Sequence, residues 1–142
     1  MTDISYVITP FIAWLLAGGL KFVINSIKAG EPAFGLIGYG GLPSNHSAIV
    51  SSTVALIAFK EGIDHPAFGV AVTLAFIVLL DANSLRRQIG RQAAAINRLT
   101  EANSPMSSPL RERMGHTPVE IVAGIFVGIS VAAFIEKLLW II

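Results

Sequence analysis

The sequence predicts an all-α fold: a polytopic membrane bundle of about four transmembrane helices plus one interfacial amphipathic helix, in a single membrane-embedded domain over residues 1–142. Of the 142 residues, 54% are hydrophobic and only 13% are charged, whereas charged residues make up about a quarter of a soluble domain. The charges are also unevenly placed, because residues 4–20, 32–59, 66–80 and 121–135 contain no Asp, Glu, Lys or Arg. Long uncharged apolar stretches are typical of helices that cross a bilayer.

Net charge and cysteine content exclude several other classes of protein. The formal net charge is +1, which gives no general attraction to nucleic acid, so we expect no nucleic-acid partner. The chain has no cysteine, which excludes disulfides, thiolate metal sites and cysteine nucleophiles. The first three residues include Asp3 and no Lys or Arg. A secretory signal starts with basic residues, so we expect the first helix to be retained.

Four apolar helices are expected from the positions of charges, glycines and prolines. The first covers residues 4 to about 24, and the loop over 30–43 that follows has too many glycines, with two prolines, for a regular helix. The second covers 44–59, the third 66–85 and the fourth 118–140. The uncharged part of the third helix is shorter than the roughly 17 to 25 residues that span a bilayer. Its polar end should therefore lie at the membrane interface or in a protein-lined pocket.

A basic segment lies between the third and fourth helices. Arg86, Arg87, Arg91 and Arg98 alternate there with apolar residues such as Ile89 at helical spacing. This pattern predicts an amphipathic helix suited to the headgroup region. Six of the ten Lys and Arg residues lie in this connection, so the positive-inside rule predicts that it is cytoplasmic and that both termini lie on the other side.

The remaining polar residues should gather at one end of the bundle. Consecutive helices run in opposite directions, which brings four polar clusters to the same face. They are Lys21, residues 44–47, Asp81 with Arg86 and Arg87, and residues 115–120. Ionisable groups near membrane depth are costly unless they are paired, and are candidate functional residues. The opposite face has an ordinary interfacial mixture of Lys60, Glu61, Asp64, His65, Glu136 and Lys137.

Each cluster also has a structural interpretation. Lys21 could extend to the headgroups, and Ser44 is a good N-cap. Thr117, Pro118 and Glu120 have the spacing of a capping box, so Glu120 could serve only to start the last helix. The meeting of all four clusters at one face of the bundle favours a functional site over these separate structural roles. Two helix N-termini with unpaired N–H groups and nearby cations form an anion site, most naturally for phosphate.

Two histidines at this face predict phosphoryl transfer to a histidine nucleophile. One imidazole must be neutral to attack phosphorus while a carboxylate accepts its other N–H, and the second can protonate the leaving oxygen. His116 and Glu120 have the i,i+4 spacing for the first pair, and His46 is the second histidine. A zinc site of the two histidines with Asp81 or Glu120 is the rival chemistry. The adjacent lysine and arginines would oppose a cation, so we expect no metal and no other cofactor.

Three motifs, in this order, resemble those of the type 2 phosphatidic acid phosphatase superfamily, which shares its phosphate site with the vanadium haloperoxidases. The motifs are GGLPSNHSA at 40–48, DANSLRRQIGRQA at 81–93 continuing to Leu99, and GHTPVE at 115–120. The chain is most similar to the small divergent branch of haloperoxidase-related membrane proteins. With Lys21, the resemblance covers nearly the whole chain.

The resemblance implies roles for the two histidines. His116 is the nucleophile that forms a phosphohistidine, Glu120 replaces the superfamily's orienting Asp, and His46 is the acid for the departing alcohol. Asp81 stays open, because it could pair with Arg86 or with the lysine of the first helix, or could itself orient the nucleophile. Enzymes of this type use no metal, in agreement with the charges around the site.

The resemblance also implies the phosphate contacts, with departures from the usual pattern. Lys21, Ser44 and the Asn45 backbone are expected to bind phosphate. However, no Arg-Pro follows the lysine, and the superfamily's PSGH is replaced by PSNH at 43–46. Arg86 and Arg87 are expected to replace the arginine that normally precedes the nucleophile, because they end a membrane helix within a fuller motif match. The alternatives, Arg111 and Arg113, lie on a turn-rich connection.

A phosphate site at the membrane surface predicts a lipid phosphate substrate whose tails remain in the bilayer. Phosphatidylglycerophosphate or phosphatidic acid is expected if the site faces the cytoplasm, and undecaprenyl diphosphate is the alternative. The alternative from another class is a non-catalytic membrane protein that binds phosphate or anionic lipid. We expect an integral protein of the bacterial inner membrane. The GxxxG pair Gly124 and Gly128 could mediate a homodimer or pack within the bundle.

Overall fold

The computed structural model describes residues 4–34, 41–103, 108–112 and 114–141. Within these ranges the regular structure is entirely helical, which confirms the all-α prediction. The elements are α1 (Ser5–Ala29), α2 (Asn45–Lys60), α3 (Pro66–Leu80), the π-helical turn η2 (Asp81–Leu85), α4 (Arg86–Asn103) and α5 (Pro118–Ile141). Three helices in the described ranges are long and apolar enough to cross a membrane, namely α1, the continuous helix Pro66–Thr100 and α5. With 16 residues, α2 is shorter.

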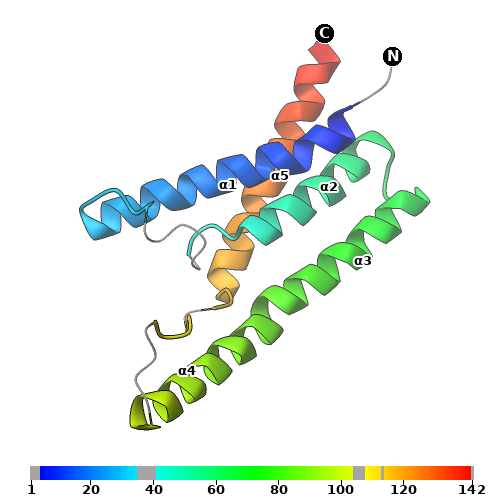
Figure 1. Ribbon diagram of the computed structural model, residues 1–142. Coiled ribbons are helices and arrows are strands. Elements are labelled where there is room, and N and C mark those ends of the chain that lie inside the picture. The colour runs from blue at the N-terminus through cyan, green and yellow to red at the C-terminus, as the bar shows by residue number, and fades with distance from the viewer. Residues whose placement is uncertain (1–3, 35–40, 104–107, 113, 142) are drawn as a thin grey trace.

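The short helix α2 is the centre of the bundle, because it packs against α1, α3 and α5. Figure 1 shows α1 and α2 side by side and antiparallel, with α5 crossing them and α3 on the side of α2 opposite α1. The start of α1 and the end of α5 lie at the same end of the molecule (Figure 1). The starts of α2 and α5 and the junction of α3 with α4 therefore lie toward the other end, as the alternating helix directions predict.

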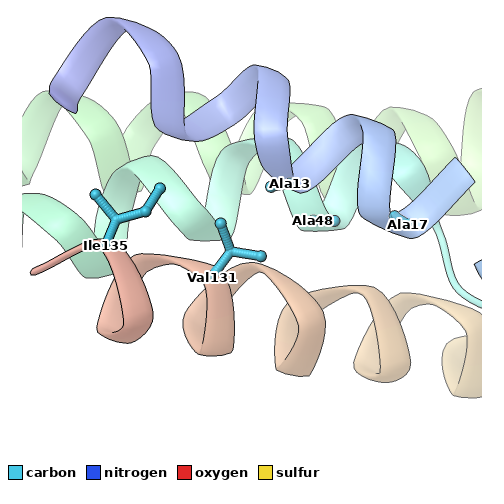
Figure 2. Packing of buried hydrophobic residues seen from close by; sticks show 5 residues of the cluster. All are labelled: Ala13, Ala17, Ala48, Val131 and Ile135. Carbon is cyan, nitrogen blue, oxygen red and sulfur yellow. The ribbon is translucent and has the colours of Figure 1, made fainter. Parts of the chain in front are cut away.

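Small side chains form the contact between α1, α2 and α5. Ala13 and Ala17 of α1 and Ala48 of α2 are fully buried, and they meet Val131 and Ile135 of α5 (Figure 2). Small residues let apolar helices approach closely, and this close contact replaces the bulky core of a soluble protein.

The GxxxG pair of α5 packs within this bundle. A side chain at Gly124 would meet Ser44 and Ser47, and a Cβ at Gly128 would lie 2.5 Å from the Ala48 carbonyl oxygen. The intramolecular alternative is therefore the one that the structure shows, and this pair offers no surface to a second copy of the chain.

Helix α1 is longer than predicted, because it continues to Ala29 rather than ending near residue 24. Gly30 ends the helix in the left-handed conformation with φ 72°, and its N–H donates to the Ser26 carbonyl 2.9 Å away. The predicted end lies shortly after Lys21, the first charged residue of the helix. Lys21 ends the uncharged apolar stretch, but the helix itself continues for eight more residues. Lys21 is therefore held on a helical turn.

The amphipathic helix is present as α4, but it continues α3 without a break. The π-helical turn η2 joins them, and Figure 1 shows α3 and α4 in line. A helix over residues 66–103 is roughly 57 Å long at 1.5 Å per residue, whereas the hydrocarbon core of a bilayer is about 30 Å thick. α4 therefore extends the α3 rod beyond the apolar part of the bundle.

Candidate active site

His116 lies directly before α5, and it is 6% exposed. Its Nδ1 is 3.1 Å from Glu120 Oε2. A carboxylate can only accept, so Nδ1 carries the hydrogen and the Nε2 of the neutral ring keeps its lone pair. The predicted capping box is also formed, because the Thr117 N–H donates to the same Oε2 at 3.0 Å and the Glu120 N–H donates to Thr117 Oγ1 at 3.3 Å. One carboxylate oxygen of Glu120 therefore accepts hydrogen bonds both from the backbone at the start of α5 and from the imidazole of His116.

The backbone around His116 is held by the π-helical turn. The His116 N–H donates to the Ala82 carbonyl oxygen at 3.0 Å. Gly115 has φ 89°, and a Cβ there would lie 2.8 Å from Arg87 Cγ and 3.4 Å from the Ala82 oxygen. Both the left-handed conformation and the close approach require glycine at this position. Single π-helical turns are frequent at functional sites, and here the turn fixes where the His116 ring stands.

His46 lies in the first turn of α2, and its ring faces the same space as His116. The ring centroids are 5.9 Å apart with an interplanar angle of 55°. The N–H of Ser44 donates to the Glu120 carbonyl oxygen at 2.9 Å, which ties the start of α2 to the first turn of α5. The hydroxyl of Ser44 accepts from the Ser47 N–H at 3.3 Å, as expected for an N-cap. The two helix starts therefore converge with a histidine on each.

Four buried polar side-chain atoms have no hydrogen-bond partner among the described residues. They are His46 Nδ1, Asn45 Oδ1, Ser47 Oγ and Asn83 Oδ1. Leaving such an atom unpaired costs about 1–3 kcal/mol. Three of the four atoms belong to consecutive residues at the start of α2. Buried polar atoms without a protein partner are usually satisfied by water or a ligand.

Lys21 is buried, at 9% exposed, so it does not extend along the lipid-facing surface. It lies within electrostatic range of Glu120, His116 and His46. A Cβ at Gly41, at the start of the motif before α2, would lie 3.8 Å from Lys21 Cγ. The lysine therefore stands beside the loop that leads to His46.

The two arginines at the start of α4 differ in position. Arg86 Nε is 3.1 Å from Asp81 Oδ2, and its charge acts on both histidines. Arg87 is exposed, with its stem beside Gly115. Asp81 therefore pairs with Arg86, while Glu120 is the carboxylate on the His116 ring. Of the alternative arginines, Arg111 is exposed and Arg113 lies outside the described residues.

Burial lowers the pKa of His116 below its ordinary value. The hydrogen bond and the charge of Glu120 oppose this effect, and the positive charges of Lys21 and Arg86 add to it. The net direction is downward, so the ring is mainly neutral at pH 7. A neutral ring with a free Nε2 is the reactive form of a histidine nucleophile.

Two asparagines at the site were not predicted as site residues. Asn83 lies in η2 between Asp81 and Arg86, and Asn25 Oδ1 would be 3.4 Å from a Cβ at Gly41. Asn25 follows Lys21 by four residues and therefore shares its helix face. That i,i+4 polar pair, directly after a long apolar stretch, was the available signal. For Asn83 the signal was weaker, because its position depends on the unpredicted π-helical turn.

Comparisons with known proteins identify the family to which the chain belongs. No solved structure matches the chain. The chain is 30% identical over 138 residues to the uncharacterized membrane protein YuiD of Bacillus subtilis (strain 168), an alignment that covers 86% of this chain and 87% of that protein. Residues 3–131, which include both histidines and Glu120, match the family model described as the Divergent PAP2 family. The chain is an integral membrane protein and belongs to the Divergent PAP2 family.

Proposed function

We propose that this protein is a membrane phosphatase that hydrolyses a lipid phosphate through a phosphohistidine on His116. The observation that carries the proposal is the buried His116–Glu120 pair, 3.1 Å apart, with the His46 ring 5.9 Å from the His116 ring. Membership of a PAP2-related family supports the same class of reaction. Lys21 and Arg86 provide positive charge at the site, so no metal is needed to neutralise the phosphate.

In the first step the lipid phosphate group lies between the starts of α2 and α5. Backbone N–H groups and the positive ends of the two helix dipoles favour the anion there. His116 Nε2 attacks phosphorus and forms the N–P bond, while the bond from phosphorus to the lipid oxygen breaks. His46 donates a proton to that oxygen, and Glu120 stabilises the positive charge that develops on the His116 ring.

In the second step water hydrolyses the phosphohistidine. His46, now neutral, accepts a proton from the water as its oxygen attacks phosphorus, and the N–P bond breaks. Phosphate leaves, and both histidines return to their starting states. The same residue acts first as acid and then as base, as expected when the two steps are mirror images.

The proposed substrate is a glycerolipid phosphate monoester, such as phosphatidylglycerophosphate or phosphatidic acid, at the cytoplasmic face of a bacterial inner membrane. The site lies where the apolar helices end, so a phosphate headgroup reaches it while the tails remain in the bilayer. Undecaprenyl diphosphate is the alternative substrate if the site faces the opposite side.

The test is phosphate release by the purified protein from a panel of lipid phosphates, in the presence of a metal chelator. His116→Ala should reduce release to background, because it removes the nucleophile. His65→Ala is the matched control, since His65 caps α3 at the opposite end of the bundle and should leave release unchanged. Labelled lipid phosphate should transfer its label to wild-type protein as an acid-labile adduct.

Full activity in His116→Ala would overturn the nucleophile assignment. A wild-type protein that binds lipid phosphates but releases no phosphate from any of them would support the non-catalytic alternative instead.

A further inference from the structure

We propose that an apolar groove beside the candidate active site holds one acyl chain of the lipid phosphate substrate. This inference rests on the proposed function and extends it from the headgroup to the tail. The groove lies between α3 and α5, and α2 forms its floor. Its volume is about 480 Å³, and its lining includes Val54 and Phe59 of α2, Ala75 and Phe76 of α3, and Ile125 and Ile129 of α5.

The groove has no free hydrogen-bonding side chain among its described lining residues. Ser51 is the one polar residue among them. Its hydroxyl donates to the Ser47 carbonyl oxygen at 2.6 Å, within its own helix. An occupant of such a groove is stabilised only by the burial of apolar area. The occupant is therefore a hydrocarbon without polar groups.

On all three helices the groove begins within roughly one and a half turns of a residue of the candidate active site. Val50, which lines it, is one turn after His46 on the same face of α2. Leu79 lines it two residues before Asp81. On α5, Ile125 follows Glu120 by little more than one turn. A lipid whose phosphate lies between the two histidines therefore has its tail at the mouth of the groove.

The length of the groove fits a single acyl chain. From Val50 to Phe59 the groove extends roughly 14 Å along α2, about half of the 30 Å hydrocarbon core, which is the depth of one leaflet.

The first experiment needs no turnover. Phosphatidic acid with a photoreactive diazirine midway along one acyl chain is incorporated into nanodiscs with the wild-type protein, and crosslinked peptides are identified by mass spectrometry. Crosslinks should concentrate on groove residues such as Val54 and Phe76. Phosphatidylcholine with the same labelled chain is the control, and it should label lipid-facing residues such as Phe11 and Val70, which are 63% and 71% exposed. Identical patterns for the two lipids would overturn the proposal.

The second experiment uses a matched pair of α3 variants. Val72→Trp fills the groove, whereas Val70→Trp places the same side chain outside the groove lining. Val72→Trp should lower kcat/KM for dioleoyl phosphatidic acid at least tenfold and leave it unchanged for a water-soluble short-chain analogue, while Val70→Trp should change neither.

Two outcomes of the second experiment would contradict the groove: no loss on the long-chain lipid, or an equal loss on both substrates. If wild-type protein hydrolyses no lipid phosphate, the proposed function fails, and the crosslinking pattern still decides whether the tail occupies the groove.

Discussion

The Oε2 atom of Glu120 accepts hydrogen bonds from both the His116 ring and the Thr117 backbone. The sequence offered these as alternative interpretations, a capping box or an orienting carboxylate, but the geometry combines them. A residue in both roles is difficult to assign by a single substitution, because losing it disturbs the helix as well as the histidine. The two roles separate when each is removed by a different variant.

Glu120→Gln keeps an oxygen that can accept from the Thr117 N–H but removes the negative charge beside His116. We expect kcat to fall by roughly 100-fold or more, in the range found when a carboxylate that orients a catalytic histidine is replaced by its amide. Thr117→Ala should instead lower stability by about 1 kcal/mol, the usual cost of a lost cap, with kcat nearly unchanged. Phosphate release and thermal unfolding in detergent measure both effects, and equal losses of kcat in the two variants would contradict the orienting role.

The lowered pKa of His116 predicts the pH dependence of catalysis. Protonation removes the Nε2 lone pair, so kcat/KM should fall as the pH falls through that pKa, which lies below the ordinary value of 6.5. Glu120 raises the pKa of His116, so its loss in Glu120→Gln should shift the acid limb to still lower pH. Comparing the pH profiles of wild type and variant on one substrate cancels the titration of the substrate itself. An acid limb that stays in place or moves to higher pH would contradict this account.

At the scale of elements, the contact between α2 and α5 depends on glycine. Gly128→Ala should destabilise the protein by about 1–3 kcal/mol, because the new Cβ would lie 2.5 Å from the Ala48 carbonyl oxygen and 2.9 Å from the Ser52 nitrogen. Gly69→Ala on α3 is the control, since a Cβ there meets nothing within 4 Å, and it should be neutral or slightly stabilising. Thermal unfolding monitored by tryptophan fluorescence gives the melting temperature of each variant. Equal melting temperatures for Gly128→Ala and Gly69→Ala would show that α2 and α5 can move apart without loss of stability.

The sequence predicted the helices well where a strong local signal marks a boundary. Ser44 begins α2 and Pro118 begins α5, as expected from capping chemistry. It failed where a boundary depends on the rest of the fold. The charge of Lys21 suggested the end of α1, but that side chain is buried against other helices. The π-helical turn has no local signature, because its wider winding is stabilised by the contact of Ala82 with the backbone of His116.

At the scale of the whole molecule, the convergence of four polar clusters could be predicted, because it follows from alternating helix directions alone. The pairing within the clusters could not. Asp81 had two possible partners and a possible role on the nucleophile. It pairs with Arg86, five residues later, across the π-helical turn, which the sequence did not predict. Which side chains meet thus depends on helix rotation, which the apolar pattern of a lipid-facing helix specifies poorly.

The distribution of basic residues predicts the orientation of the whole molecule. Because the chain has no cysteine, a single introduced cysteine is a unique probe. Arg91→Cys on α4 and Asp64→Cys in the opposite turn are both at exposed positions. In intact cells a membrane-impermeant maleimide should label Asp64→Cys only, and Arg91→Cys should react only after permeabilisation. The reverse pattern would place the site on the outer side and favour undecaprenyl diphosphate as substrate.

The π-helical turn sets the rotational phase of α4 relative to α3. In η2 the Arg86 N–H donates to the Asp81 carbonyl, five residues earlier, so the turn contains one residue more than an α-helix would. If the same residues were wound as a regular α-helix, everything beyond them would be rotated by about 100° around the common axis. The membrane part of the rod would keep its packing on α2, while Arg86 and Arg87 would swing away from the histidines. The wide turn thus sets the angle between the part of this helix that packs in the bundle and the part that carries Arg86 and Arg87.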